Sequence, residues 1–226
     1  MYDLFIGNKN YSSWSLRPWV LLRELGIPFR ERQVVFGGPD PDAFRAFSPT
    51  GKVPCLVDGA TTVWDSLAIT EYVGERHPGV WPSESAARAF ARSAAAEMHS
   101  GYSALRDICT MNCGIRVKLH TVSPALQRDL ARLEELWADG LGRFGGPFLA
   151  GARFTAADAF FAPVAFRIQT YEPPVNPAAR RYAAQLLALP SMQEWYNAAL
   201  RETWRDEPHE AEARTVGEWT ADLRAS

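Results

Sequence analysis

A break at residues 77–82 divides the sequence into two parts with different secondary-structure signals. The segment His-Pro-Gly-Val-Trp-Pro places two prolines and a glycine within six residues, which is typical of a linker. Strand and helix signals alternate before the break, whereas helix starts predominate after it. A chain of 226 residues is long enough for two small domains, each with its own core. We therefore expect domains at 1–77 and 84–226, joined by a linker at 78–83.

The first part of the sequence predicts a small mixed sheet with helices on its faces. An apolar strand, a helical repeat and a second strand come first, and such a unit is right-handed with parallel strands. A hairpin with an Asp-Gly turn and a closing helix follow, so the predicted order is βαβ-α-ββα. The predicted strands are 2–7, 28–35, 54–57 and 61–64, and the predicted helices are 15–25, 42–47 and 66–76.

The second part of the sequence predicts helices and no strands. Ser123-Pro124 and Asn176-Pro177 each combine an N-cap residue with proline at the first helical position. The spacing of a capping box, in which a cap hydroxyl and an acid three residues later bond reciprocally, occurs at 155–158 and 191–194. The last stretch, 204–226, is charged but carries spaced tryptophan and aliphatic residues. We expect it to dock on the body of the protein.

Charge and hydrophobicity exclude several classes of partner. The formal net charge is −2, and lysine and arginine are not clustered enough to follow a phosphate backbone, so we expect no nucleic-acid binding. No apolar run approaches the roughly 20 residues of a membrane-spanning helix. The first residues carry an acid and no basic segment, which disfavours a signal peptide. The sequence therefore predicts a cytoplasmic protein without membrane contact.

Three cysteines, at positions 55, 109 and 113, are too few and too scattered for a disulfide framework. Cys109 and Cys113 have i, i+4 spacing with His120 nearby, which suggests a metal site at first sight. A structural zinc site needs four ligands, however, and free cysteine is more often a small buried apolar residue. We expect no metal.

The polar loop 7–17 joins the first predicted strand to the first predicted helix. Ligands of open α/β sheets bind at such loops. Ser12 and Ser13 lie where the helix N-terminus favours negative charge, and a hydroxyl donor there stabilises a thiolate, lowering the pKa of a thiol from about 8.5. The alternative is that these serines only cap the helix.

Two further segments carry groups suited to a small peptide. Proline at position 54 opens a strand, and a cis Val53–Pro54 bond would let the Val53 main chain pair with a ligand as an added strand. Lys52 is placed to meet a carboxylate or is simply solvated. Asp65 and Ser66, at the start of the next helix, suit the ammonium and carboxylate of one amino acid, or serve as an N-cap.

The order of these segments resembles the glutathione S-transferase (GST) superfamily. SSWSLR at 12–17, SPTGKVPCL at 48–56 and DSLAITEYV at 65–73 are similar to its glutathione-binding elements, and FTAADAFFAPV at 154–164 to a capping box of its second domain. The resemblance extends to about residue 200. It implies a thioredoxin-like, glutathione-binding N-terminal domain followed by an all-helical C-terminal GST domain, and a homodimer that uses glutathione as co-substrate.

The resemblance also implies a role for each candidate residue. Ser12 would stabilise the glutathione thiolate, with Ser13 as the alternative, while Thr155 and Asp158 would be structural. The implied glutathione-binding residues are Lys52 at the glycyl carboxylate, Val53 at the cysteinyl main chain, Pro54 as the cis-proline, and Asp65 and Ser66 at the γ-glutamyl end.

The loop is most similar to zeta-like bacterial members of the serine type, whose pattern is Ser-Ser-Cys-Ser-x-Arg. Trp14 replaces that cysteine here, which disfavours zeta-type isomerase activity. The expected function is transfer of glutathione to a small hydrophobic electrophile in detoxification. Alternatives are a glutathione-dependent isomerase or dehalogenase, and a non-catalytic binding module.

The expected electrophile pocket lies between the first loop and the first long helix of the second domain. Trp14 and Tyr102 are the candidate lining residues. Tyr11, Met98 and Met111 are further candidates, and Met98 and Tyr102 are expected to share one helical face.

Overall fold

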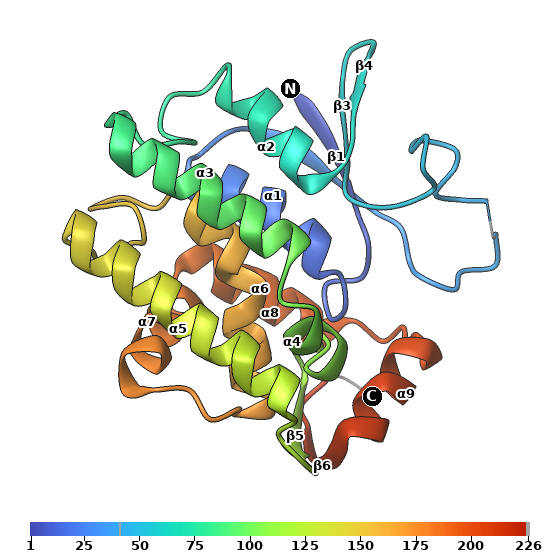
Figure 1. The fold of residues 1–226 in the computed structure, drawn as a ribbon. Coiled ribbons are helices and arrows are strands. Elements are labelled where there is room, and N and C mark those ends of the chain that lie inside the picture. Colours follow the sequence, from blue (N-terminus) through green and yellow to red (C-terminus); the bar gives the residue numbers. More distant parts are fainter. Residues whose placement is uncertain (41, 225–226) are drawn as a thin grey trace.

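The computed structural model of the protein describes residues 1–40 and 42–224 (Figure 1). A thioredoxin-like domain contains the first sheet, and helices dominate the second domain. The elements of the first are β1 (Tyr2–Ile6), α1 (Ser13–Glu24), β2 (Phe29–Gln33), β3 (Cys55–Asp58), β4 (Thr61–Val63) and α2 (Ser66–Gly74). The elements of the second are α3 (Ser85–Ser100), α4 (Ser103–Ile108), β5 (Ile115–Leu119), α5 (Pro124–Phe144), α6 (Ala156–Tyr171), α7 (Pro177–Leu187), α8 (Pro190–Arg201), α9 (Glu207–Val216) and β6 (Gly217–Asp222).

The sheet of the first domain has the strand order β2-β1-β3-β4. β1 pairs in parallel with β2 and antiparallel with β3, and Leu4 lies opposite Glu31 on one side and Leu56 on the other. β3 and β4 form the predicted hairpin. The predicted helix at 42–47 is wrong, because these residues form turns. A six-residue segment gains too few hydrogen bonds to offset helix nucleation on its own, and unlike the six-residue α4 this one contributes no residue to the core.

The helix starts of the second domain follow the sequence signals, with one exception. Ser123 Oγ accepts from Leu126 N at 3.2 Å, and Asn176 Oδ1 accepts from Ala179 N at 2.9 Å. The capping box of Thr155 and Asp158 is also present. The capping box predicted at 191–194 is wrong, because α8 already begins at Pro190. Proline suits the first helical position, so its presence moves the helix start ahead of the serine.

The expectation that the second part has no strands is also wrong. β5 and β6 form a two-stranded antiparallel sheet, in which Lys118 lies opposite Glu218. The segment Ile-Arg-Val-Lys-Leu alternates apolar and polar residues, but it is too short to stand out among helices. As expected, the last stretch docks on the body, through α9 and β6.

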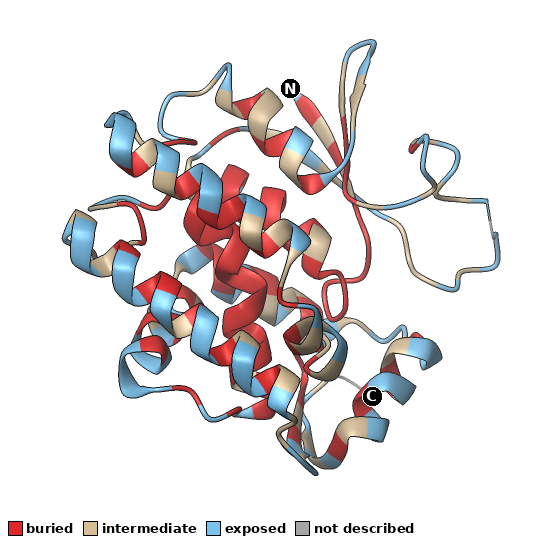
Figure 2. Cartoon of the chain, viewed as in Figure 1, coloured by how far each residue is buried: buried red, intermediate tan, exposed pale blue. Residues whose placement is uncertain are grey.

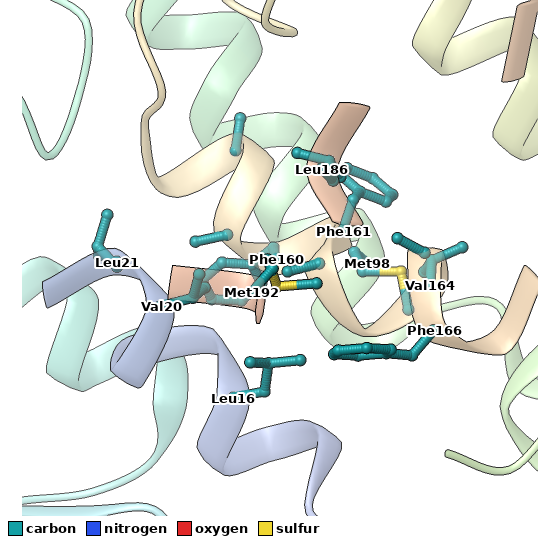
Figure 3. Close-up of a cluster of buried hydrophobic side chains, with 14 of the residues drawn as sticks. Leu16, Val20, Leu21, Met98, Phe160, Phe161, Val164, Phe166, Leu186 and Met192 are labelled. Carbon is teal, nitrogen blue, oxygen red and sulfur yellow. The ribbon is translucent and has the colours of Figure 1, made fainter. Parts of the chain in front are cut away.

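The core runs without interruption from one domain to the other. α6 is buried along almost its whole length and packs against α1, α3 and α7 (Figure 2). In Figure 3, Leu16 and Val20 of α1 point toward Phe160 of α6. Met98 belongs to the same buried cluster, so its interpretation as a pocket residue is wrong. This packing fixes where α1 begins relative to the helical domain.

Within the described residues, no helix is both long enough and apolar enough to cross a membrane.

Candidate functional site

A cleft of about 720 Å³ opens at the start of α1, between the two domains. Its walls come from the first loop, the segment before β3, and α4, α6 and α9 of the helical domain. The residues that line it are Tyr11, Ser12, Ser13, Trp14, Phe36, Phe44, Gly51, Lys52, Val53, Arg106, Asp107, Thr110, Met111, Arg167, His209 and Glu212.

The first loop is held in place by residues far along the chain. The Lys9 and Asn10 main-chain N–H groups donate to the Glu202 carboxylate at 2.7 and 3.1 Å. Trp195 Nε1 donates to the Lys9 carbonyl at 2.9 Å. The loop therefore presents its serines to the cleft from a fixed position.

The two serines of this loop differ in their hydrogen bonds. Ser12 Oγ donates to Ser15 Oγ at 2.7 Å, and Ser15 Oγ also accepts from the Gly7 N–H at 3.1 Å. The Ser13 hydroxyl makes no hydrogen bond to any part of the chain that the structure describes, although the residue is only 8% exposed. Neither serine side chain accepts a capping bond from the first turn of α1. The interpretation of these serines as helix caps is therefore wrong, and the helix start faces the cleft without a cap.

The tyrosine of this loop is not free to bind a ligand through its hydroxyl. Tyr11 lines the cleft, but its hydroxyl donates to Glu210 Oε1 at 2.6 Å. Burial, together with the neighbouring Glu210 carboxylate, raises the pKa of Tyr11. Among the hydroxyls of the loop, the serines are the better donors toward a ligand.

The segment before β3 offers an unpaired main-chain edge. The Val53–Pro54 bond is cis, as the sequence predicted, and Pro54 is buried behind the cleft. Val53 lines the cleft, and its main-chain N–H and C=O pair with nothing in residues 1–40 and 42–224. Lys52 also lines the cleft and is exposed, without an ion pair to the described residues.

The start of α2 lies outside the residues that line the cleft. Asp65 Oδ1 accepts from Leu67 N at 2.9 Å, which is the N-cap that the sequence offered as an alternative. Asp65 Oδ2 lies 3.4 Å from His99 Nε2 and remains exposed. The Ser66 hydroxyl is buried and finds no partner in the described chain. Both residues are thus placed beside the cleft rather than in its wall.

The two residues predicted for the electrophile pocket have different positions. Trp14 lines the cleft, with Arg17 and Arg106 stacked on its ring. Tyr102 does not line it; the residue is buried, and its hydroxyl donates to Glu97 at 2.9 Å. Tyr102 has a φ of 56° beyond the end of α3, so it does not share a helical face with Met98 as expected.

The helical domain contributes cleft residues that sequence reasoning missed. Arg106 comes from α4, Arg167 from α6 and His209 from α9. His209 stacks on Tyr11 at a ring separation of 5.0 Å, and its Nδ1 lies 2.5 Å from Asp206 Oδ2. No local motif marks these residues. The basic residues within the apolar run of α6 and in the segment before β5 were the available signal.

All three cysteines are buried. Cys109 follows the end of α4 and Cys113 lies outside any helix, so the two do not share a helical face as suggested. Burial raises the pKa of Cys109 to about 12. No cluster of three or more His, Cys, Asp or Glu residues suited to a metal ion occurs in the described part of the chain.

Comparisons with known proteins agree with this geometry. Residues 11–76 match the family model of the glutathione S-transferase N-terminal domain, and residues 121–198 that of its C-terminal domain. A zeta-class glutathione S-transferase of Euphorbia esula is 29% identical over 161 residues, covering 67% of this chain and 70% of that protein. A dichloromethane dehalogenase of Methylorubrum extorquens is 44% identical over 59 residues, a stretch that covers 25% of this chain and 20% of the dehalogenase.

A solved structure with glutathione has the same arrangement of domains. It is a glutathione transferase homologue from Burkholderia gl BGR1, with 26% identity and a TM-score of 0.64 over 88% of this chain and 97% of that one. The two family domains, in order, and the shared architecture lead to one conclusion. The chain belongs to the glutathione transferase superfamily.

Proposed function

We propose that the protein is a glutathione transferase that stabilises the glutathione thiolate at the uncapped start of α1. The observation that supports this most directly is that a helix N-terminus and a free hydroxyl, that of Ser13, face the same cleft. Main-chain N–H groups, the helix dipole and a hydroxyl donor all favour the charged form of a thiol. A helix start whose only task was structural would use its serines as caps.

Of the two serines, Ser13 is the better-placed donor. Its hydroxyl makes no bond to the described residues, whereas Ser12 must give up its bond to Ser15 before it donates to sulfur. We assign Ser13 the direct contact with the glutathione sulfur. Ser12 would hold the loop in place and serve as the second possible donor. This reverses the order that the family resemblance implied.

The remainder of the tripeptide has matching groups. The Val53 main chain is free to pair with the cysteinyl residue as a short antiparallel strand. Lys52 supplies a charge for the glycyl carboxylate. Asp65 keeps an exposed carboxylate oxygen for the γ-glutamyl ammonium, and Ser66 with the start of α2 suits its carboxylate. Pro54 supports this edge from behind.

The proposed reaction is nucleophilic. The thiol proton goes to solvent, the thiolate attacks an electrophilic carbon of a small second substrate, and a sulfur–carbon bond forms as halide leaves. Displacement of halide from an alkyl carbon is the second candidate activity, favoured by the local similarity to dichloromethane dehalogenase. We further propose a cytoplasmic homodimer that acts in detoxification.

A titration of bound glutathione tests the proposal. We expect the ultraviolet absorbance of the thiolate to appear at a pH at least one unit below that of free glutathione, and Ser13→Ala to reverse most of this shift. Protein that is retained on immobilised glutathione, but does not shift the thiol titration, would be a binding module. Protein that is not retained at all would contradict the proposal.

A further inference from the structure

Two arginines stack on one tryptophan of the cleft, and a third lies beside them in the helical domain. The guanidinium carbons of Arg17 and Arg106 lie 4.1 and 4.4 Å from the centre of the Trp14 ring. Arg167 Nη1 donates to the Arg106 carbonyl at 3.1 Å and also to the Cys109 carbonyl. Arg106 and Arg167 line the cleft, and Arg17 lies directly behind Trp14.

The guanidinium groups are poorly satisfied within the protein. Arg17 is 1% exposed, and none of its nitrogens donates a hydrogen bond to the residues that the structure describes. Arg167 is 4% exposed, and its Nε is likewise buried without an acceptor there. A buried charge without a partner is costly, so native proteins normally pair it.

No carboxylate of the described residues forms an ion pair with these three arginines. The negative charge of Asp65 acts on Arg17, but this carboxylate also caps α2 and lies against His99. Asp107 and Glu212 line the cleft and are exposed to solvent, and neither forms an ion pair with Arg106 or Arg167. The Asp107 charge opposes the lowering of the Arg106 and Arg167 pKa values by burial, but it acts without a direct contact. Burial and the positive charges of Arg106 and Arg167 lower the pKa of Arg17. Arg17, Arg106 and Arg167 therefore have no ion-pair partner among the described residues, and their charges are left available to a ligand.

Arg106 and Arg167 are separate from the groups proposed for glutathione. Lys52, Val53 and Asp65 all belong to the first domain, whereas Arg106 and Arg167 belong to α4 and α6. In the proposed function, the helical side of the cleft faces the second substrate. Arg106 Nη1 donates to the His99 carbonyl at 3.1 Å, but Arg106 Nε and Nη2 and Arg167 Nη2 make no hydrogen bond to the described residues. Guanidinium donors of this kind match a planar carboxylate.

We infer that the second substrate is an anionic electrophile, whose carboxylate is bound by Arg106 and Arg167 beside the Trp14 ring. The inference rests on the proposed function and replaces the hydrophobic electrophile expected from the sequence. The inference concerns the wall formed by the helical domain, whereas the groups proposed for glutathione belong to the first domain. Experiments can therefore test the anion site and the transferase proposal separately.

A pair of electrophiles that differ in charge tests the inference. We compare 4-chloro-3,5-dinitrobenzoate with its methyl ester at saturating glutathione, each rate divided by its uncatalysed rate. We expect the benzoate to have the higher kcat/KM, and Arg106→Gln to lower the ratio of the two values about tenfold or more, since a hydrogen bond to a charged group is lost. Arg106→Lys should keep part of the preference. Arg128→Gln, which removes an exposed arginine of α5, is the matched control and should keep all of it.

Two kinetic outcomes would overturn the inference while leaving the transferase proposal intact. One is a wild-type enzyme that prefers the ester. The other is an Arg106→Gln variant in which both rates fall equally with a raised KM for glutathione, because the arginines would then bind the tripeptide itself.

A binding measurement separates the two proposals when no conjugation occurs. Calorimetry of para-nitrobenzoate and para-nitrobenzamide, with the wild-type protein and Arg106→Gln, needs no turnover. Binding of the benzoate alone, weakened about tenfold by the substitution, supports the anion site even if the transferase proposal fails. Equal binding of the two probes, or binding of neither, contradicts the anion site.

Discussion

The start of α6 and the start of α1 contain similar residues, but their side chains form different hydrogen bonds. At α6, Asp158 is fully buried and accepts from the Leu149 and Thr155 main-chain N–H groups, both at 2.9 Å, and from the Tyr182 hydroxyl at 2.7 Å. At α1, two serines lie at the helix start, and neither caps it. One helix start is closed by the protein's own side chains, and the other opens into the cleft.

The difference teaches how to separate a structural helix start from a functional one. The first-turn N–H groups of any helix need acceptors. Where the end is buried in the core, as at α6, the protein must supply them, because water has no access. There the Val80 carbonyl accepts from the Ala156 N–H at 2.9 Å. Where it borders a cleft, the position can be reserved for a ligand. The deciding feature is therefore whether the cap residues bond to their own helix, not which residue types they are.

The largest predicted effect is a loss of stability on removing the buried carboxylate at the start of α6. Asp158→Ala would leave the Leu149 and Thr155 N–H groups and the Thr155 and Tyr182 hydroxyls without this acceptor, and we expect the free energy of unfolding to fall by about 3–5 kcal/mol. Asp158→Asn keeps an acceptor oxygen and should cost less. Urea unfolding measures both variants, and a loss below about 1 kcal/mol for Asp158→Ala would contradict the account of α6 given above.

The second largest predicted effect is a loss of conjugation rate on removing a serine hydroxyl at the start of α1. We expect Ser13→Ala to lower kcat/KM for conjugation about 10- to 100-fold, the worth of a hydrogen bond to a charged group, with a change in unfolding free energy within about 0.5 kcal/mol. Ser12→Ala should lower the rate less and the stability more, because it removes the bond to Ser15.

Thr155→Ala is the matched hydroxyl deletion at α6. It should cost about 1 kcal/mol of stability and leave the rate of the folded enzyme unchanged. If Ser13→Ala instead destabilises the protein as Thr155→Ala does, and conjugates at the normal rate, the two helix starts do not differ in the way proposed.

Local patterns in the sequence were enough to predict most of the fold. The alternation of strands and helices, the hairpin and the cis bond before Pro54 depend on neighbouring residues, and the structure has them except for the helix expected at 42–47. The errors also have local causes. The capping box at 191–194 failed because Pro190 starts the helix, and β5 was missed because five residues carry a weak periodic signal.

The sequence predicted most of the residues that the first domain contributes to the candidate site, but few of those of the helical domain. The serines, Lys52 and Val53 lie in segments that a motif can mark. Other features of the site depend on contacts between residues almost 200 positions apart, such as Glu202 with the Lys9 main chain and Glu210 with Tyr11. No sequence pattern specifies such pairs, since they exist only once the last helices dock on the first loop. For the same reason, the arginines of the helical wall were not anticipated.

A third helix start, that of α2, lies between the two extremes and gives the smallest predicted effect. One oxygen of Asp65 accepts from the Leu67 N–H and so caps the helix, while the other remains exposed beside the cleft. Asp65→Ser should keep the cap, so we expect unchanged stability, but glutathione affinity should fall about fivefold through loss of an exposed charge pair.

Asp65→Ala should weaken glutathione binding by the same factor and also cost about 1 kcal/mol of stability, because it removes the cap. Calorimetric titration with glutathione and urea unfolding of both variants separate the two roles. If Asp65→Ser binds glutathione as tightly as the wild type does, Asp65 is a cap and nothing more. The start of α2 would then belong with that of α6 and, of these three helix starts, that of α1 alone would be kept open for a ligand.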